Sequence, residues 1–400
     1  MSTRMILHVD LDAFFCAVES LLDPSLHGKP HAVGGSPSGR GVIASASYEA
    51  RAFGVRSAMP SAQALRLCPQ LILLRGRHGV YGQYSRQVME ILRQAAPVVE
   101  QISIDEAFLD VSDDRLEGRE VAAQLQAKIL EEVSLPTSWG VASNKLVAKI
   151  ATDEGKPNGL VVVPPGGEAD FLAPLPVRRL WGVGPKTAER LAGVGVTTIG
   201  ELAQLSAPRL KQLFGDHGPD LAARACGIDN RPLVTEHDPR SLSAERTFAT
   251  DLTREKDLAR QMLSMCETVG RRLRKAGLAG MTVRIKLRWS DFTTITRQTR
   301  LAQPTDQDGE IFNAAQALFK AAWKKGRPVR LLGVGVADLG LPSRQLNLFD
   351  QSWQEESNLL SAIDEIRERF GSGAVRRAGR MRPKKDDEKQ GEEDGKMEED

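Results

Sequence analysis

The chain has 400 residues, 41% of them hydrophobic and 26% charged, an ordinary composition for a globular protein with room for two to four domains. Its formal net charge of +2, taken over the whole chain, argues against a strongly basic nucleic-acid-binding protein. No apolar run approaches the roughly 18–20 residues of a membrane span, and residues 1–10 do not have the pattern of a signal peptide.

Residues 1–165 alternate strand-like and helix-like segments. Short apolar runs predict strands at 5–10, 41–46 and 137–141, and two more within 98–111 around a polar centre. The helical spacing of apolar residues predicts helices over 14–22, 80–95, 118–133 and 143–153. Strands separated by helices and hairpins in this order indicate an α+β sheet domain.

A Pro/Gly-rich break at 163–167 predicts a domain boundary, and short glycine-punctuated helices follow over 168–228. A polar stretch at 227–241 is typical of a linker. The next unit has the order β-α-β-β-α-β, which is the split-βαβ arrangement. Its predicted strands are 243–249, 282–289, 292–300 and 330–338, and its predicted helices are 254–276 and 310–324.

Positive charge is concentrated in this second unit. Residues 240–342 contain nineteen basic and ten acidic residues, whereas the net charge is −3 over 1–239 and −7 over 386–400. Because strand side chains alternate between faces, Arg284, Lys286 and Arg288 share one face of the sheet. Such a row is often only a solvated face, but with further cations on the next strand it favours a phosphate-binding surface. The further cations are Arg297 and Arg300.

Three acidic residues lie at predicted strand ends. Asp10 ends an apolar strand, and Asp105 and Glu106 lie between two apolar stretches. Carboxylates in such surroundings are costly unless a positive group binds them. Mg²⁺ fits this need because it prefers oxygen ligands and often binds a few carboxylates together with substrate phosphates. Alone, an Asp-Glu pair in a hairpin is more often exposed, so the prediction depends on other segments.

Three of those segments could bind phosphates. Tyr48 and Arg51 are three residues apart on one predicted helix face, and arginine matches phosphate oxygens bidentately. Lys156 lies at a rigid turn, Lys156-Pro-Asn-Gly159, and could supply a positive charge to a phosphate. The turn Gly182-Val-Gly184 precedes a helix and would expose backbone N–H groups to an anion. An ordinary turn or surface helix explains each segment alone; together they describe a site for a metal, a triphosphate and a nucleic-acid backbone.

Five ordered motifs then carry a family resemblance. They are His8-Val-Asp10-Leu-Asp12-Ala-Phe14-Phe15, Tyr48-Glu-Ala-Arg51-x-Phe-Gly-Val, Ser103-Ile-Asp105-Glu106-Ala-Phe-Leu-Asp110, Gly140-Val-Ala-Ser-Asn144-Lys145 and Lys156-Pro-Asn-Gly159. With these motifs, residues 1–370 resemble the Y-family DNA polymerases of the DNA polymerase IV type. The resemblance implies a right-hand arrangement of domains. Its palm would be 1–10 and 76–165, its fingers 11–75, its thumb with a helix-hairpin-helix 166–238, its linker 239–241 and its little finger 242–341.

The resemblance also implies roles for single residues. Asp10, Asp105, Glu106 and the Leu11 carbonyl would hold two Mg²⁺ ions. Phe15 would be the steric gate that excludes a 2′-hydroxyl, although from the residue alone a core phenylalanine is the better interpretation. The implied dNTP contacts are Phe14, Ser45, Tyr48, Arg51 and Lys156, and the implied DNA contacts are Gly182, Gly184, Lys186, Arg284, Lys286, Arg288 and Arg297.

The family's activity is template-directed DNA synthesis of low fidelity across damaged templates. Small residues in the fingers, such as Gly34, Gly41 and Ala44, would leave space around the nascent base pair. No second carboxylate cluster suggests a proofreading exonuclease. A palm-type nucleotide cyclase, a degenerate scaffold protein and a polymerase V-like subunit are the alternatives. The basic unit argues against the first, and the retained carboxylates argue against the second.

The C-terminal residues 342–375 would hold a clamp-binding motif and a helix over 355–370. The motif Gln345-Leu346-Asn-Leu348-Phe349 resembles the peptide that binds the bacterial sliding clamp. The charged tail, 376–400, is expected to be disordered. The chain as a whole is expected to be a cytoplasmic monomer. Its isolated cysteines indicate buried thiols rather than a zinc site or disulfides; they are Cys16, Cys68, Cys226 and Cys266.

Overall fold

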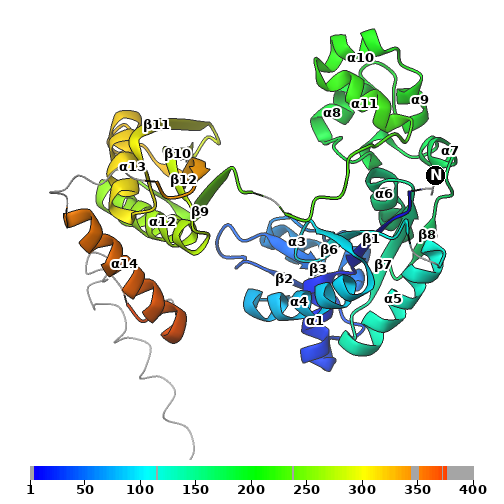
Figure 1. Ribbon diagram of the computed structural model, residues 1–400, viewed down its shortest axis with the longest axis horizontal. Coiled ribbons are helices and arrows are strands. Elements are labelled where there is room, and N and C mark those ends of the chain that lie inside the picture. The colour runs from blue at the N-terminus through cyan, green and yellow to red at the C-terminus, as the bar shows by residue number, and fades with distance from the viewer. Residues whose placement is uncertain (1–3, 114–115, 237, 344–350, 372, 376–400) are drawn as a thin grey trace, which may run out of the picture. The chain divides into compact units, whose positions relative to one another are not determined.

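The computed structural model describes residues 4–113, 116–236, 238–343, 351–371 and 373–375. The chain divides into two compact units, Met1–His237 and Asp238–Asp400, and each is described by itself (Figure 1). Among the described residues, no helix combines the length and the apolar character needed to cross a membrane.

A five-stranded sheet forms the centre of the first unit. Its strands are β1 (Ile6–Leu11), β5 (Val98–Gln101), β6 (Glu106–Asp110), β7 (Thr137–Ala142) and β8 (Leu160–Val162), in the spatial order β5-β6-β1-β7-β8. The central strand β1 pairs antiparallel with both β6 and β7, and every one of its residues is buried. A strand covered on both faces needs apolar side chains on both, which explains the continuous apolar run at the start of the sequence.

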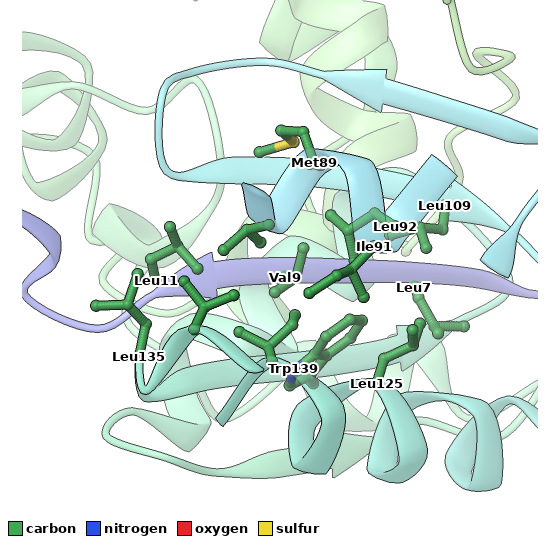
Figure 2. Packing of buried hydrophobic residues seen from close by; sticks show 14 of the residues in the cluster. Leu7, Val9, Leu11, Met89, Ile91, Leu92, Leu109, Leu125, Leu135 and Trp139 are labelled. Carbon is green, nitrogen blue, oxygen red and sulfur yellow. The ribbon is translucent and has the colours of Figure 1, made fainter. Parts of the chain in front are cut away.

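One face of this sheet packs against long helices. Leu7, Val9 and Trp139 point to the side covered by α4 (His78–Ala95) and α5 (Gly118–Val133) (Figure 2). Helix α1 (Phe14–Leu22) adds buried residues to the same core. The predicted helices at 14–22 and 118–133 are confirmed with the same bounds, and α4 begins two residues earlier than predicted.

The opposite face packs against α6 (Lys145–Gly155). Asn144, just before the helix, caps it, because its side-chain oxygen accepts a hydrogen bond from the Val147 N–H. The close approach of α6 requires a glycine on β7. A Cβ atom at Gly140 would lie 2.0 Å from the Ala148 carbonyl oxygen, so any side chain there would push the helix away. The position of α6 is therefore set by direct backbone contact with the sheet.

A small three-stranded sheet follows β1 and α1. Its strands are β2 (His31–Gly34), β3 (Ile43–Ala46) and β4 (Ile72–Leu74), in the order β3-β2-β4. Residues such as Ala32, Ile43 and Ala50 form its own compact core. The short elements around it are η1 (Pro24–Leu26), α2 (Tyr48–Ala52) and α3 (Ser61–Leu67).

Short helices occupy the remainder of the first unit, as the glycine-punctuated sequence predicts. They are α7 (Glu168–Leu172), η2 (Val177–Arg179), α8 (Pro185–Ala192), α9 (Ile199–Ala203), α10 (Ala207–Phe214) and α11 (His217–Ala225). Their apolar residues share a core with α6 and with Ile6 and Phe108 of the central sheet. The expectation that all four thiols are buried is wrong for Cys226, which is exposed because it lies at the solvent-facing C-terminal end of α11.

The second unit confirms the predicted β-α-β-β-α-β order. It consists of β9 (Ser241–Leu252), α12 (Glu255–Lys275), β10 (Ala279–Trp289), β11 (Thr294–Thr305), α13 (Asp308–Ala322) and β12 (Val329–Gly340), followed by α14 (Gln351–Phe370). The sheet order is β11-β10-β12-β9, and its buried face packs against α12 and α13. Together with the first unit, this is an α+β protein.

Candidate active site

The three predicted carboxylates meet at one edge of the central sheet. Asp10 near the end of β1 lies directly opposite Glu106 at the start of β6. The Asp105 carbonyl oxygen accepts a hydrogen bond of 2.9 Å from the Leu11 N–H, which holds the hairpin against the end of β1. Pairing of β1 with β6 therefore brings together Asp10 and Glu106, which are 96 positions apart in the sequence.

Two lysines pair with two of these acids. Lys156 Nζ lies 2.6 Å from Asp10 Oδ2, and Lys149 Nζ lies 2.8 Å from Glu106 Oε2. Burial raises the pKa of the Asp10 carboxyl, and the Lys156 ammonium offsets part of that rise. Burial also acts to raise the pKa of Glu106, but the neighbouring His8 ring and the charge of Lys149 outweigh it, so its pKa is lowered.

His8, on β1, lies beside Glu106 of β6. Its ring is completely buried, and burial lowers its pKa to about 4, so the ring is neutral at pH 7. His8 Nδ1 is 2.9 Å from the Thr152 hydroxyl, and its Nε2 is 3.9 Å from Glu106. A neutral ring at that distance packs beside Glu106 rather than forming an ion pair with it.

A cavity of about 150 Å³ opens beside the carboxylates. Asp10, Leu11, Asp105 and Lys156 line one part of it, and Phe14, Phe15, Ser45 and Arg51 line another. The ring of Phe14 also belongs to the hydrophobic core, with only 2% of the residue exposed. The cavity thus joins predicted metal ligands to most of the predicted nucleotide-binding residues. The exceptions are Glu106 and Tyr48, which do not line the cavity.

Asp12 links Tyr48 to the site, a role that the sequence analysis did not assign. Its carboxylate is buried and accepts a hydrogen bond of 2.9 Å from the Tyr48 hydroxyl and one of 2.7 Å from the Asn158 N–H. The Ser138 hydroxyl lies within 3.0 Å of both carboxylate oxygens. The guanidinium of Arg51 lies 4.5 Å from the centre of the Tyr48 ring. The signal in the sequence is its place two residues after Asp10, within the motif that carries the family resemblance.

Replacing Asp12 by asparagine is therefore expected to weaken nucleotide binding. An amide offers one acceptor oxygen where three donors converge, so Tyr48 and the turn after Lys156 lose their common anchor. We expect the KM for the incoming nucleotide to rise about tenfold, with a smaller change in kcat. Steady-state kinetics with Asp23→Asn, an exposed carboxylate that caps a short helix, provide the matched control. An unchanged KM would show that Asp12 has no part in the site.

The donor set agrees with a magnesium site in chemistry. Asp10, Asp105 and Glu106 offer only oxygen atoms and lie at the same sheet edge. Within the part of the chain that the structure describes, however, no three His, Cys, Asp or Glu side chains are grouped closely enough to hold a metal ion. One of these carboxylates, Asp10, is already paired with Lys156.

The predicted anion-binding turn lies between η2 and α8. Gly182 has a φ of +96°, a left-handed conformation that favours glycine, and Gly184 precedes the first turn of α8. Both glycines and Lys186 are exposed. The two glycines and the lysine are therefore accessible to solvent at the start of this helix.

The basic face of the second unit is confirmed for three of its predicted residues. Arg284, Lys286 and Arg288 lie on the face of β10 away from the helices, where their partners on β11 are Gln298, Thr296 and Thr294. Gly333 and Gly335 of β12 lie on the same face beside Lys286 and Arg284.

Arg297 was expected on this basic face, and that expectation is wrong. It is opposite Ile285, a residue of the buried face, whereas Arg300 is opposite Thr282 on the basic face. Residues three apart on a strand point to opposite sides, so Arg297 and Arg300 cannot share a face. The strand also begins at Thr294 rather than at 292, because Phe292, with a φ of +64°, belongs to the preceding turn.

The motif at 345–349 lies outside the described residues, and so does the tail at 376–400. The predicted helix at 355–370 is confirmed and begins four residues earlier, at Gln351. It packs on the second unit through ion pairs, among them Arg274 with Asp364 at 2.7 Å.

Family models match successive parts of the chain. The impB/mucB/samB family matches residues 9–153, the IMS family HHH motif matches 165–196, and the impB/mucB/samB family C-terminal domain matches 239–348. A DNA polymerase IV of Dehalococcoides mccartyi (strain CBDB1) is 42% identical over 94% of this chain and 97% of its own. One from Desulfatibacillum aliphaticivorans is 44% identical over 94% of this chain and 96% of its own.

A solved structure, a Y-family DNA polymerase chimera, superposes with a TM-score of 0.76 at 26% identity, covering 84% of this chain and 99% of that one. The similarity to these proteins spans both units.

Proposed function

Because the chain belongs to the Y-family DNA polymerases, of the DNA polymerase IV type, and is therefore a DNA-directed DNA polymerase, we propose that it extends primers across damaged template bases. The observation that carries the proposal is the convergence of Asp10 and Asp105 with Lys156 and Arg51 around one cavity. Carboxylates that can hold cations, next to cations that can hold a triphosphate, are what nucleotidyl transfer requires. We propose that no proofreading step accompanies synthesis.

The proposed metal ligands are Asp10, Asp105, Glu106 and the carbonyl of Leu11. Two Mg²⁺ ions held there would lower the pKa of the primer 3′-hydroxyl and stabilise the departing pyrophosphate. Lys156 would leave Asp10 and bind the triphosphate. Arg51, Tyr48, Ser45 and the start of α1 at Phe14 would orient the same group. Apart from Glu106, which pairs with Asp10 across β1 and β6, the residues of this assignment line the cavity or are tied to it through Asp12.

Phe15 is proposed to be the steric gate. Its side chain lines the cavity beside Asp10 and is partly buried, so a flat ring stands next to the expected position of the sugar. The neighbouring lining residues Ala44 and Ser45 are small, which leaves space around the nascent base pair. Loose packing at that position favours tolerance of distorted templates at the expense of fidelity.

The DNA would be held by surfaces in both units. In the proposed division, palm, fingers and thumb fall in the first unit and the little finger is the second. Backbone N–H groups at Gly182 and Gly184, with Lys186, would bind phosphates through the thumb. Arg284, Lys286 and Arg288 would follow the backbone of the duplex, and DNA affinity should then fall steeply with salt. Arg297, on the other face, is left out of this proposal.

The direct test is primer extension with purified protein, Mg²⁺ and all four dNTPs, on undamaged templates and on a panel of templates with single lesions. We expect extension on the undamaged template and past at least one lesion, with no shortening of a mismatched primer. Failure to extend any template would favour a scaffold function. Extension that stops at every lesion would contradict the translesion assignment while leaving the polymerase activity intact.

The clamp motif predicts a separate outcome. Replacing Leu348 and Phe349 together by alanine should leave basal extension unchanged. The two residues come after β12, the last strand of the second unit, and are not among the residues that line the cavity. Stimulation by a bacterial sliding clamp should be lost, since the two apolar side chains are the proposed anchors in the clamp's pocket. Product lengths with and without loaded clamp measure this. Equal stimulation of the wild-type and variant proteins would refute the motif.

A further inference from the structure

The ring of Phe15 does not stand alone in the cavity wall. It stacks on the ring of Tyr81, with centroids 4.3 Å apart and planes 14° from parallel. His78 contacts both rings edge-on, each at 5.9 Å between centroids. The Tyr81 side chain belongs to α4 and is fully buried, so it forms a fixed wall behind Phe15.

A buried carboxylate holds that wall in place. Glu19 Oε1 accepts a hydrogen bond of 2.5 Å from the Tyr81 hydroxyl. Arg77 forms a bidentate pair with the same carboxylate through its Nε and Nη2 atoms. Only 4% of Glu19 is exposed. A buried carboxylate without partners would carry a large desolvation cost, so the contacts with Tyr81 and Arg77 are needed for the folded structure.

These contacts connect helices α1 and α4 at two points. Phe15 and Glu19 are four residues apart on α1, so they lie on the same face of that helix. Arg77 immediately precedes α4, and Tyr81 is four residues further along. The stack joins Phe15 to Tyr81, and the ion pair joins Glu19 to Arg77. These two contacts fix the position of α1 relative to α4 next to Phe15.

We propose that Glu19 is a positioning residue for sugar selection, holding Tyr81 so that Phe15 cannot retreat from a 2′-hydroxyl. This inference rests on the proposed function of Phe15 as the steric gate. A gate discriminates by sub-ångström distance, so its rigidity depends on what stands behind it. Aromatic stacking alone is weak and lets rings slide, whereas a charged hydrogen bond fixes the orientation of the phenol.

The electrostatics support a permanently charged anchor. Burial acts to raise the pKa of Glu19, but the hydrogen bonds from Arg77 and Tyr81 outweigh it, so the pKa is lowered. Burial and the Glu19 hydrogen bond raise the pKa of Tyr81 to about 12. At pH 7 the phenol is therefore the donor and the carboxylate the acceptor.

The test measures discrimination, defined as kcat/KM for dCTP divided by kcat/KM for CTP opposite a template guanine. Tyr81→Phe keeps the ring and its stacking but removes the hydroxyl, and Glu19→Gln keeps the shape but removes the charge. Each is expected to lower discrimination about 3- to 10-fold, mainly through faster use of CTP. The kcat/KM for dCTP should stay within about twofold of the wild type.

Two further variants separate positioning from general destabilisation. Glu100→Gln is the matched control, because Glu100 is equally buried and pairs with Lys145 at 2.5 Å, away from the gate. It should lower the melting temperature without changing discrimination. In a Phe15→Ala background, Glu19→Gln should have no further effect on discrimination, because the residue it positions is gone.

The outcomes are distinct. Loss of discrimination in Phe15→Ala but not in Tyr81→Phe or Glu19→Gln would overturn this inference and leave the gate assignment intact. Unchanged discrimination in Phe15→Ala would overturn the gate itself. An additive effect of Glu19→Gln in the Phe15→Ala background would also count against the inference. If Glu19→Gln does not fold, Tyr81→Phe alone decides, since it removes one hydroxyl and keeps the packing.

Discussion

Replacing Asp105 by alanine is expected to abolish primer extension, lowering kcat/KM by at least about 10³-fold, the upper range of losses when one stabiliser of transition-state charge is removed. Asp105 lines the cavity, and the Ser103 hydroxyl donates to its Oδ1 at 2.5 Å, which orients the carboxylate. Its removal would take an oxygen ligand from the proposed metal site while leaving the β1–β6 pairing unchanged. A gel-based extension assay over a range of Mg²⁺ concentrations measures the effect.

The same strand offers a matched control. Asp110 lies at the far end of β6, opposite Ile6, where it accepts hydrogen bonds from Ser112. Asp110→Ala should cost some stability but retain extension. Extension by Asp105→Ala at the wild-type rate would remove Asp105 from the active site, whatever the behaviour of the control.

Replacing Phe15 by alanine is expected to admit ribonucleotides. Without the ring, the cavity wall beside Asp10 recedes to Tyr81, and a 2′-hydroxyl finds space. Discrimination between dCTP and CTP should fall by about 10²-fold, while incorporation of dCTP falls much less. Single-nucleotide incorporation kinetics measure both values.

Phe53→Ala provides the comparison for this variant, because Phe53 is 45% exposed at the end of α2 and loses little packing. It should keep wild-type discrimination. If Phe15→Ala also keeps it, sugar selection resides elsewhere in the cavity.

The sequence allowed much of this architecture to be predicted, for identifiable reasons. The second unit has long strands with clear alternation, such as β10, and helices of three turns or more, so its β-α-β-β-α-β order was predictable. The strands β2, β4 and β8 were missed because they have only three or four residues, too few for a period to show. The site carboxylates were found because strand ends can be located from apolar runs.

What the sequence did not reveal depends on contacts between distant segments. Asp12 was quoted within a motif, but its link to Tyr48 and Asn158 exists only after β1, α2 and the turn following α6 come together. Glu19 would be read from sequence as a polar residue of an amphipathic helix. Arg297 was misplaced for a local reason, since an odd spacing from Arg300 already puts the two on opposite faces.

Because lysines pair with two of the carboxylates, the protein is expected to fold without a bound metal ion. Where ligands carry uncompensated negative charge, a chain often folds only when the metal is present. Here Lys156 and Lys149 neutralise Asp10 and Glu106 from within the same unit. The protein is therefore expected to keep its melting temperature within about 2 °C when a chelator is added, which calorimetry can check. In the proposed mechanism, binding a cation would be an exchange of partners, in which Lys156 moves from the Asp10 carboxylate to the incoming triphosphate.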